Sequence, residues 1–370
     1  MSEFDDFLKN FGKSTQETYG CALKKYFKVI EKDPKNYFQK GKRKYSEKEL
    51  LKYEEDVKKF WRAMKNTTPT SLKNYMGVVR VYLQDNYVDL PNKLWKDFKK
   101  RQKGTRSIIQ DIVPTKKQFK QLITHGNALH KAFITTLLSS GMRIGECCQI
   151  KEKDVDFSFK PTKIEIKGEY TKTGNRRTVF ISDEATEFLK EWLKEKPQYL
   201  EYAVKKLNFK NYEKKLDDER IFPFDKNVGR QKWNKLLIKS GLGQRDNSTQ
   251  VSRFKIHPHV TRKFYRTWMA KDIGRDMTEY FLGHEAGLDS VYRRYGDDSN
   301  KRILGNEYLK GMRNVTIFTD VSEDVEQLNE EISKIRSDNE RFKELMDRMQ
   351  MKIDILETKL EVEKQKNGKK

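Results

Sequence analysis

The sequence predicts a mainly α-helical protein that carries a small β-hairpin in its larger domain and ends in a coiled coil. Three observations indicate this fold class. Apolar residues recur every three or four positions through much of the first 315 residues, as they do in amphipathic helices. Residues 163–182 instead contain two alternating stretches, and a heptad repeat begins after residue 320.

Residues 1–103 are expected to form a helical domain with a basic outer face. Helix starts are indicated at Ser14, at Ser46 with Glu49 as a capping box, and at Thr68 followed by Pro69. After the first start, four apolar side chains share one helical face: Tyr19, Leu23, Tyr26 and Val29. For any single helix, the alternative reading of its basic face is an ordinary solvated surface.

Residues 104–113 read GTRSIIQDIV and interrupt the helical pattern before Pro114, so we expect a linker there. Residues 114–320 are expected to form the larger domain, which is mostly helical. Within it, the alternating stretches KIEIKGEY and RRTVFIS flank TKTGN, where Gly174 and Asn175 favour a turn. A β-hairpin with Lys172 at its tip is therefore expected in this domain.

Residues 321–370 are predicted to be a coiled coil followed by a basic tail. Its core positions run from Val325 to Leu360 at alternating spacings of three and four, over about five heptads. One core position is polar, Asn339, and such a residue can set register or oligomeric state. The alternative is one long helix that folds back on the rest of the chain.

The charge of the chain indicates a polyanionic partner. Lys and Arg number 78 against 55 Asp and Glu, a net charge of +23. Residues 321–370 have a net charge of −2, which leaves +25 in the first 320 residues. Nucleic acid is the polyanion that this excess favours; the alternative is a protein that is merely basic.

Several other classes are disfavoured. No apolar run approaches the roughly 20 residues that a membrane helix needs, and the polar start MSEFDDFLKN is unlike a secretory signal, so we expect a cytoplasmic protein. The three cysteines, Cys21, Cys147 and Cys148, form neither a disulfide framework nor a zinc motif. The sequence GKST at residues 12–15 lacks the earlier glycine of a phosphate loop, because Phe7 stands there. No metal or cofactor is expected.

Two short motifs carry candidate chemistry. Arg143 follows Gly141 at the expected start of a helix, and Glu146 lies three residues on, where its carboxylate could orient the arginine. His259 and Arg262 are three residues apart and would share a helical face, while His257 before Pro258 is expected outside that helix. Taken singly, an Arg–Glu pair or an HxxR motif is more often structural than catalytic.

The order of these motifs resembles the tyrosine recombinase, or phage integrase, family. The pattern is Arg143, Lys172 in the hairpin, His259-x-x-Arg262, the LGH ending at His284, and then a tyrosine. The resemblance spans about residues 14–315, and GLDSVYRRY with NEYLKGMRNVTIFT looks closest to integrases of archaea and their mobile elements. It implies a helical core-binding domain at 1–103 and a catalytic domain at 114–320, which together clamp double-stranded DNA.

The resemblance also implies a role for each site residue. Arg143 and Arg262 would bind the non-bridging phosphate oxygens, and His284 would hydrogen-bond the phosphate. His259 would assist deprotonation of the nucleophile or donate to a phosphate oxygen, and Lys172 would protonate the departing 5′ oxygen. A tyrosine would form a covalent 3′-phosphotyrosyl link, which conserves the bond energy for rejoining.

Two tyrosines compete for the nucleophile. The family usually places it nine residues after the LGH histidine, but Tyr292 is at +8 and Tyr295 at +11 from His284. The local match of GLDSVY to archaeal relatives favours Tyr292, whereas omitting Gly287 and Leu288 as an insertion would favour Tyr295. As neighbours at i and i+3 on a helix, either could reach the phosphate.

The predicted activity is site-specific recombination by four protomers on two DNA sites, through a Holliday junction, with the coiled coil adding to protomer pairing. Two alternatives remain at this point. One is a type IB topoisomerase-like enzyme that cuts and rejoins without strand exchange. The other is a catalytically inactive DNA-binding architectural protein derived from an integrase.

Overall fold

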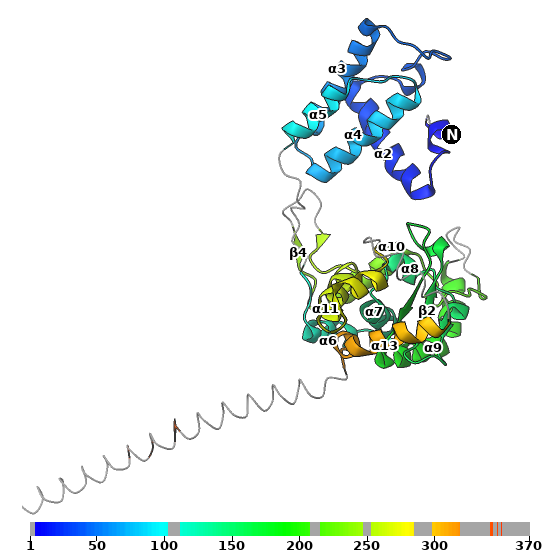
Figure 1. Ribbon diagram of the computed structural model, residues 1–370, viewed down its shortest axis with the longest axis vertical. Coiled ribbons are helices and arrows are strands. Elements are labelled where there is room, and N and C mark those ends of the chain that lie inside the picture. The colour runs from blue at the N-terminus through cyan, green and yellow to red at the C-terminus, as the bar shows by residue number, and fades with distance from the viewer. Residues whose placement is uncertain are drawn as a thin grey trace, which may run out of the picture. The chain divides into compact units, whose positions relative to one another are not determined.

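The computed structural model of the chain describes residues 4–102, 112–207, 215–246, 253–284 and 298–318, together with residues 341, 342, 346 and 349. The chain divides into two compact units (Figure 1). Unit 1 comprises Met1–Gln110 with Asp246–Arg253, and unit 2 comprises Asp111–Arg245 with Phe254–Lys370. The predicted linker lies almost wholly outside the described residues.

Within residues 4–102, unit 1 consists of helices joined by turns and loops, and its second segment begins and ends in two short strands that are given with unit 2 below. Its elements are α1 (Asp5–Leu8), α2 (Lys13–Ile30), η1 (Pro34–Asn36), α3 (Glu47–Met64), α4 (Pro69–Asp85) and α5 (Asn92–Arg101). Helix α2 packs against α3 and α4, and its predicted apolar face supplies Leu23 and Tyr26 to the buried core. Tyr19 and Val29, on the same face, pack against that core at its edge.

Two of the three predicted helix starts in unit 1 are confirmed. Glu49 accepts from the backbone N–H of Ser46 at 2.9 Å, and Thr68 caps α4 immediately before Pro69. The predicted cap at Ser14 is wrong, because α2 begins at Lys13 with Gly12 as its N-cap. The preceding helix α1 brings the chain to this turn, where the amide of Gln16 donates to the carbonyl of Phe11 at 2.8 Å.

Unit 2 combines helices with two small antiparallel sheets. Its elements are α6 (Lys116–Thr124), α7 (Ala128–Ser140), α8 (Ile144–Cys147), η2 (Glu152–Asp154), β1 (Val155–Asp156), β2 (Lys163–Ile166), η3 (Gly168–Tyr170), β3 (Arg177–Phe180), α9 (Asp183–Leu207), α10 (Lys226–Lys239), β4 (Arg245–Asp246), β5 (Arg253–Phe254), α11 (Val260–Leu282) and α13 (Asp298–Val315). This mainly helical fold with a minor β component agrees with the predicted class.

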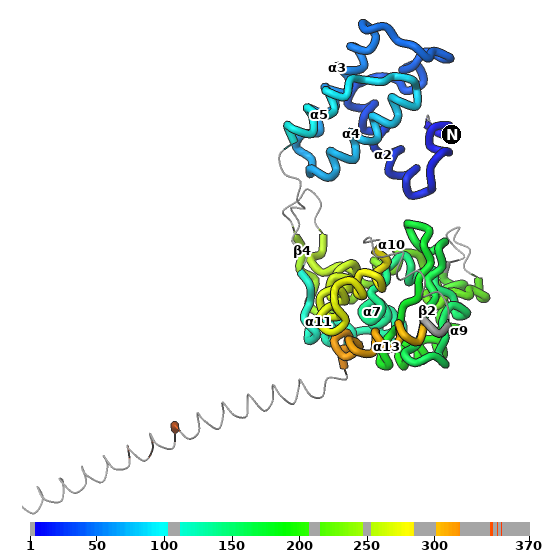
Figure 2. Tube along the Cα trace, viewed as in Figure 1, coloured from blue at the N-terminus to red at the C-terminus, as the bar shows by residue number. Residues whose placement is uncertain are grey.

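Helix α7 forms the centre of unit 2. Nearly all of its residues are buried, as expected for a helix that is apolar on every side. It packs against α9, α11 and α13, and Figure 2 shows it between α11 and α9. Because α7 ends at Ser140, the turn that carries Arg143 begins from the most fixed helix of the unit.

The predicted hairpin is present and belongs to a three-stranded sheet in the order β1-β2-β3. Strands β2 and β3 are antiparallel, with Lys163 opposite Phe180 and Ile166 opposite Arg177. Ile164 and Val179 are buried and attach the sheet to the core. The register therefore places Arg177 at the end of the β2–β3 ladder, next to the connection that contains Lys172.

Helix α11 is kinked, and this kink determines the site. Gly274 has φ 77° and ψ 167°, a non-helical conformation that favours glycine. In a straight helix, Arg262 and Leu282 would lie about 30 Å apart. Instead the guanidinium of Arg262 donates to the carbonyl oxygen of Leu282 at 2.8 Å, so the kink returns the end of α11 to its beginning.

The predicted coiled coil lies outside the described residues except at a few positions. Arg341, Phe342, Met346 and Met349 are helical, which is compatible with the heptad but does not establish it, so the coiled coil remains a prediction. Across the part of the chain that the structure describes, no helix is both long enough and apolar enough to span a membrane.

Candidate active site

Arg143 is held at the turn between α7 and α8. Gly141 ends α7 in the left-handed conformation, with φ 63°, and Arg143 is the N-cap of α8. Glu146 accepts from the backbone N–H of Arg143 at 2.8 Å and from its Nη1 at 2.9 Å. The predicted Arg143–Glu146 pair is therefore present, and it leaves 34% of the arginine side chain exposed.

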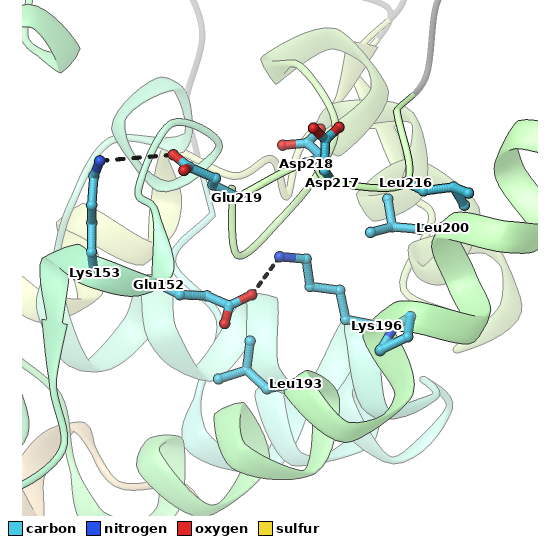
Figure 3. A pocket seen from close by; sticks show the side chains of 10 residues that line it. Glu152, Lys153, Leu193, Lys196, Leu200, Leu216, Asp217, Asp218 and Glu219 are labelled. Atoms are coloured by element: carbon cyan, nitrogen blue, oxygen red, sulfur yellow. Dashed lines mark hydrogen bonds and ion pairs between the residues drawn. The ribbon is translucent and has the colours of Figure 1, made fainter.

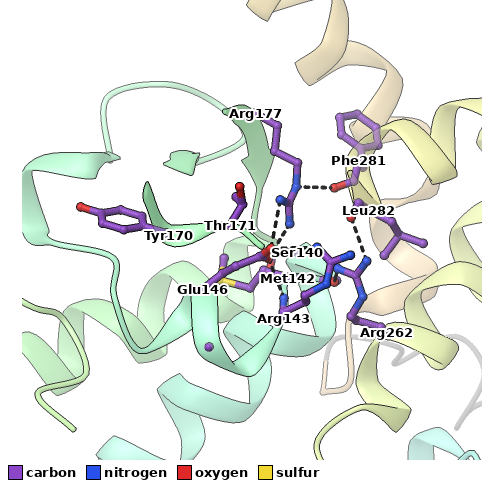
Figure 4. A network of polar contacts seen from close by, with 12 residues as sticks. Ser140, Met142, Arg143, Glu146, Tyr170, Thr171, Arg177, Arg262, Phe281 and Leu282 are labelled. Carbon is purple, nitrogen blue, oxygen red and sulfur yellow. Dashed lines mark hydrogen bonds and ion pairs between the residues drawn. The ribbon is translucent and has the colours of Figure 1, made fainter. Parts of the chain in front are cut away.

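Arg262 is almost completely buried beside Arg143. It is 4% exposed, and its Nη1 donates to the carbonyl oxygen of Gly141 at 2.7 Å. Its Nη2 donates to the carbonyl oxygen of Leu282 at 2.8 Å and lies 3.0 Å from Nε2 of His284. The arginine thus joins the turn after α7 to the end of α11 (Figure 4).

The electrostatics around Arg262 favour an anionic ligand. Burial, and then the positive charges of Arg143 and Arg177, lower the pKa of Arg262 to about 10. Two buried carboxylates, Glu146 and Glu279, act in the opposite direction on this pKa. Each of them already accepts from other cations: Glu146 from Arg143 and Arg177, and Glu279 from Arg266. A bound phosphate would relieve the repulsion between the arginines and would satisfy their remaining N–H groups.

His284 follows the left-handed Gly283 that ends α11. Its Nδ1 lies 2.5 Å from Oε2 of Glu279, and Glu279 also accepts from Nε of Arg266. Although burial raises the pKa of Glu279, hydrogen bonds from His284 and Arg266 lower it below its usual value. The ionised carboxylate therefore fixes a proton on Nδ1, and Nε2 is left to accept from Arg262.

Arg177 is a site residue that sequence reasoning missed. Its side chain is 7% exposed; Nη2 donates to Oε2 of Glu146 at 2.6 Å, and Nε donates to the carbonyl oxygen of Phe281 at 3.1 Å. Figure 4 shows Arg143, Arg177 and Arg262 pointing toward one another. The only available signal was an arginine at the start of a buried strand, in RRTVFIS.

Glu146 is held ionised by this arrangement. Burial raises the pKa of Glu146, but hydrogen bonds and charge from Arg177 and further bonds from Arg143 lower it below its usual value overall. A carboxylate that is 2% exposed therefore keeps its charge and fixes two guanidinium groups. The contacts of Glu146 with Arg143 and Arg177 therefore order the cluster in the absence of a ligand.

Two more of the predicted residues, Lys172 and His259, lie in the described part of the chain. Lys172 is exposed in the segment between η3 and β3, and His259 is exposed at the N-cap of α11. The prediction that His257 lies outside the helix is confirmed. His259 is the cap rather than a residue within the helix, because Val260 is the first helical position. Tyr292 and its alternative Tyr295 lie outside the described residues.

A separate pocket in unit 2 has the opposite character (Figure 3). It has a volume of about 480 Å³ and lies between α9 and residues 216–219. Four of its lining side chains are carboxylates, Glu152, Asp217, Asp218 and Glu219, and its buried Lys196 already donates to Glu152 at 2.5 Å. These carboxylates would repel a polyanion, so this pocket does not suit a phosphate of nucleic acid as the arginine cluster does.

Comparison with known proteins agrees with this choice of site. The model described as "Phage integrase family" matches residues 113–302, a little over half of the chain, and this match covers every residue of the cluster. A curated relative, "Tyrosine recombinase XerA" of the archaeon Saccharolobus solfataricus, is 24% identical over 304 residues, 81% of this chain and 88% of the relative.

Solved structures show the same fold. A lambda integrase dimer bound to a COC′ core site has a TM-score of 0.50 and 13% identity, covering 80% of this chain and 77% of that one. Residues 75–356 of lambda integrase bound to DNA also give a TM-score of 0.50, with 12% identity, covering 77% of this chain and 91% of that one. The family match over more than half of the chain is decisive: the chain belongs to the phage integrase family of tyrosine recombinases.

Proposed function

We propose that the chain is a site-specific DNA recombinase that cuts and rejoins strands through a 3′-phosphotyrosyl intermediate. The observation that carries this proposal is the cluster in which Arg143, Arg177 and Arg262 surround one buried carboxylate, Glu146. The cluster is positive, partly accessible and already ordered. These are the properties that stabilise the negative charge of a phosphoryl transfer transition state.

Arg143 and Arg262 have different tasks in this proposal. Arg143 keeps a third of its side chain exposed, so its fork can turn to a non-bridging phosphate oxygen while Glu146 holds its other edge. Arg262 is buried and fixed by two backbone carbonyls, so it defines where the phosphate sits. Bidentate contacts from guanidinium groups suit the planar array of phosphate oxygens.

The reaction itself transfers the phosphoryl group from one oxygen to another. The phenolic oxygen of Tyr292 attacks phosphorus, and its proton passes to His259. The bond from phosphorus to the 5′ oxygen breaks, and Lys172 donates the proton that this leaving oxygen needs. Rejoining reverses each step with a 5′ hydroxyl from the partner strand, so no net bond energy is consumed.

His284 changes its hydrogen-bonding role when phosphate binds. Nε2 faces Arg262, while Nδ1 is held by Glu279. To donate to a phosphate oxygen, Nε2 has to take up a proton. The Glu279 carboxylate, bonded to Nδ1, holds the ring so that Nε2 is the atom available for that donation.

The two units are proposed to act together on double-stranded DNA. Residues 1–103 would form the core-binding domain and residues 114–320 the catalytic domain, and the charge of +25 in the first 320 residues would attract the phosphate backbone. Lambda integrase is bound to a COC′ core site in one of the solved structures of the same fold and to DNA in the other. We expect the protein to act in the cytoplasm on DNA, and its origin to be an archaeal mobile element.

The predicted coiled coil is proposed to support assembly of four protomers on two DNA sites. Deleting residues 321–370 should lower the number of protomers per particle measured by sedimentation, because the heptad removes apolar side chains from water only when helices pair. Replacing Asn339 by leucine in the full chain is the matched control and should alter the oligomer without abolishing it. An unchanged number of protomers per particle after the deletion would contradict the proposal.

The decisive test of the function uses suicide substrates, which are DNA duplexes that carry nicks. They are prepared from fragments of the genome that encodes the chain. The protein is incubated with these fragments without added metal, and the products are separated on a denaturing gel. We expect a covalent protein–DNA band in which the DNA is attached through its 3′ phosphate, together with a released strand that carries a free 5′ hydroxyl. Sequencing the captured fragments identifies the site.

Other outcomes of the same assay point to the rival functions. Relaxation of supercoiled plasmids without recombination of two sites would indicate a topoisomerase-like enzyme. Tight binding to captured DNA without any covalent band would indicate an inactive architectural protein. Recombinant product from two captured sites, with a Holliday junction as intermediate, supports the proposed recombinase.

A further inference from the structure

Arg177 connects three parts of the catalytic unit that are far apart in sequence. It belongs to strand β3, it donates to the carboxylate of Glu146 on α8, and it donates to the carbonyl oxygen of Phe281 near the end of α11. The same guanidinium also approaches Oε1 of Glu146 at 3.3 Å. One buried side chain therefore fixes the spacing between the hairpin, the Arg143 turn and the LGH turn.

The backbone around Arg177 is shaped to accept it. Gly283 has φ 67°, and a Cβ atom at this position would lie 3.0 Å from the Arg177 side chain. The glycine of LGH thus leaves room for the guanidinium as well as supplying a left-handed turn.

We propose that Arg177 is a positioning residue for cleavage, which holds Glu146 and thereby Arg143, and which holds the end of α11 that supplies the Leu282 carbonyl and His284. This inference rests on the proposed function. In it, Arg177 does not touch the phosphate. It acts through the two residues that do, by fixing the acceptor that orients Arg143 and the turn that carries His284.

Lysine is unable to replace Arg177 in this role. The guanidinium donates from Nη2 to Glu146 and from Nε to Phe281, in two directions set by its plane. A lysine ammonium is a single point of charge on a flexible stem, so it can reach one acceptor only. Arg177→Lys therefore keeps the positive charge of the site but loses one of the two hydrogen bonds, to Glu146 or to Phe281.

The test measures single-turnover cleavage of the captured site on three nicked duplexes. One has the natural scissile phosphate, one has a methylphosphonate in its place, and one has sulfur in place of the 5′ bridging oxygen. A methylphosphonate removes the negative charge that Arg143 neutralises. The bridging sulfur is a good leaving group that needs no general acid, so it removes the need for Lys172.

Arg177→Lys should slow cleavage of the natural phosphate by about 100-fold, as a misplacement of catalytic groups by about 1 Å can do. On the methylphosphonate duplex, the cleavage rate of Arg177→Lys should come close to that of the unaltered protein. On the duplex with the bridging sulfur, the variant should remain slower by a similar factor as on the natural phosphate. Arg176→Lys is the matched control, since Arg176 is the exposed neighbour on the same strand edge, and it should cleave all three duplexes at the normal rate.

Three results would overturn the inference. They are normal cleavage by Arg177→Lys, recovery on the bridging sulfur rather than the methylphosphonate, and an equal loss on all three duplexes. If the single variant does not fold, Arg177→Met combined with Glu146→Gln leaves no buried unpaired charge and should give the same pattern. Failure of the unaltered protein to form any covalent product would instead reject the proposed function.

Discussion

Tyr292→Phe is expected to abolish the covalent protein–DNA product, while Tyr295→Phe is expected to leave it in place. The phenylalanine variant keeps the ring and its packing but lacks the oxygen that attacks phosphorus, so no phosphotyrosyl bond can form. The measurement is the covalent band from a nicked suicide duplex on a denaturing gel. DNA affinity, followed separately by filter binding, should be unchanged in both variants.

The two tyrosines provide the control for each other. They lie eight and eleven residues after His284. Because Glu279 and Arg262 hold this histidine in place, the number of residues between it and each tyrosine limits how far that tyrosine can extend. Loss of the band only in Tyr295→Phe would show that Gly287 and Leu288 are an insertion and that Tyr295 is the nucleophile. Bands in both single variants would mean that either tyrosine can attack.

Local features of the fold were predictable because each rests on residues close in sequence. The capping residues Ser46 and Thr68, the strand alternation around Gly174, and the Arg143–Glu146 pair all depend on spacings of a few positions. The order of the motifs then indicated the family. Short-range spacing, together with a characteristic order, therefore indicated the fold class and singled out four residues that the structure brings together, Arg143, Glu146, Arg262 and His284. The catalytic roles of the predicted residues stay predictions.

Contacts that depend on the path of the chain were not predictable in the same way. Nothing in VTRKFYRTWMAKDIGRDMTEYFL shows that Gly274 folds the helix back on itself, because a glycine inside a helical pattern is usually tolerated. Without that kink, the neighbourhood of Arg262 and His284 does not exist. Arg177 was not predicted for a related reason. Its two acceptors belong to α8 and α11, which are far from it in the sequence.

Arg262→Lys is expected to lower the single-turnover cleavage rate by about 100- to 1,000-fold, the usual effect of removing one donor that stabilises charge in a transition state. The arginine serves the carbonyl oxygens of Gly141 and Leu282 from two different nitrogens. A single ammonium can serve one of these acceptors and then has no donor placed toward the phosphate. Denaturing gels of quenched time points give the rate.

The same substitution should also cost stability, because a buried carbonyl oxygen that loses its donor is left unsatisfied, at about 1–3 kcal/mol. Urea unfolding of unit 2 measures that cost and shows whether the lost cleavage reflects unfolding. Arg275→Lys, an exposed position on the same helix, is the matched control and should change neither quantity. The contrary result is a folded Arg262→Lys protein that cleaves within about tenfold of the normal rate, which corresponds to about 1.4 kcal/mol of transition state stabilisation. That result would show that the buried arginine is structural, because loss of an arginine that binds the phosphate lowers the rate by more than tenfold.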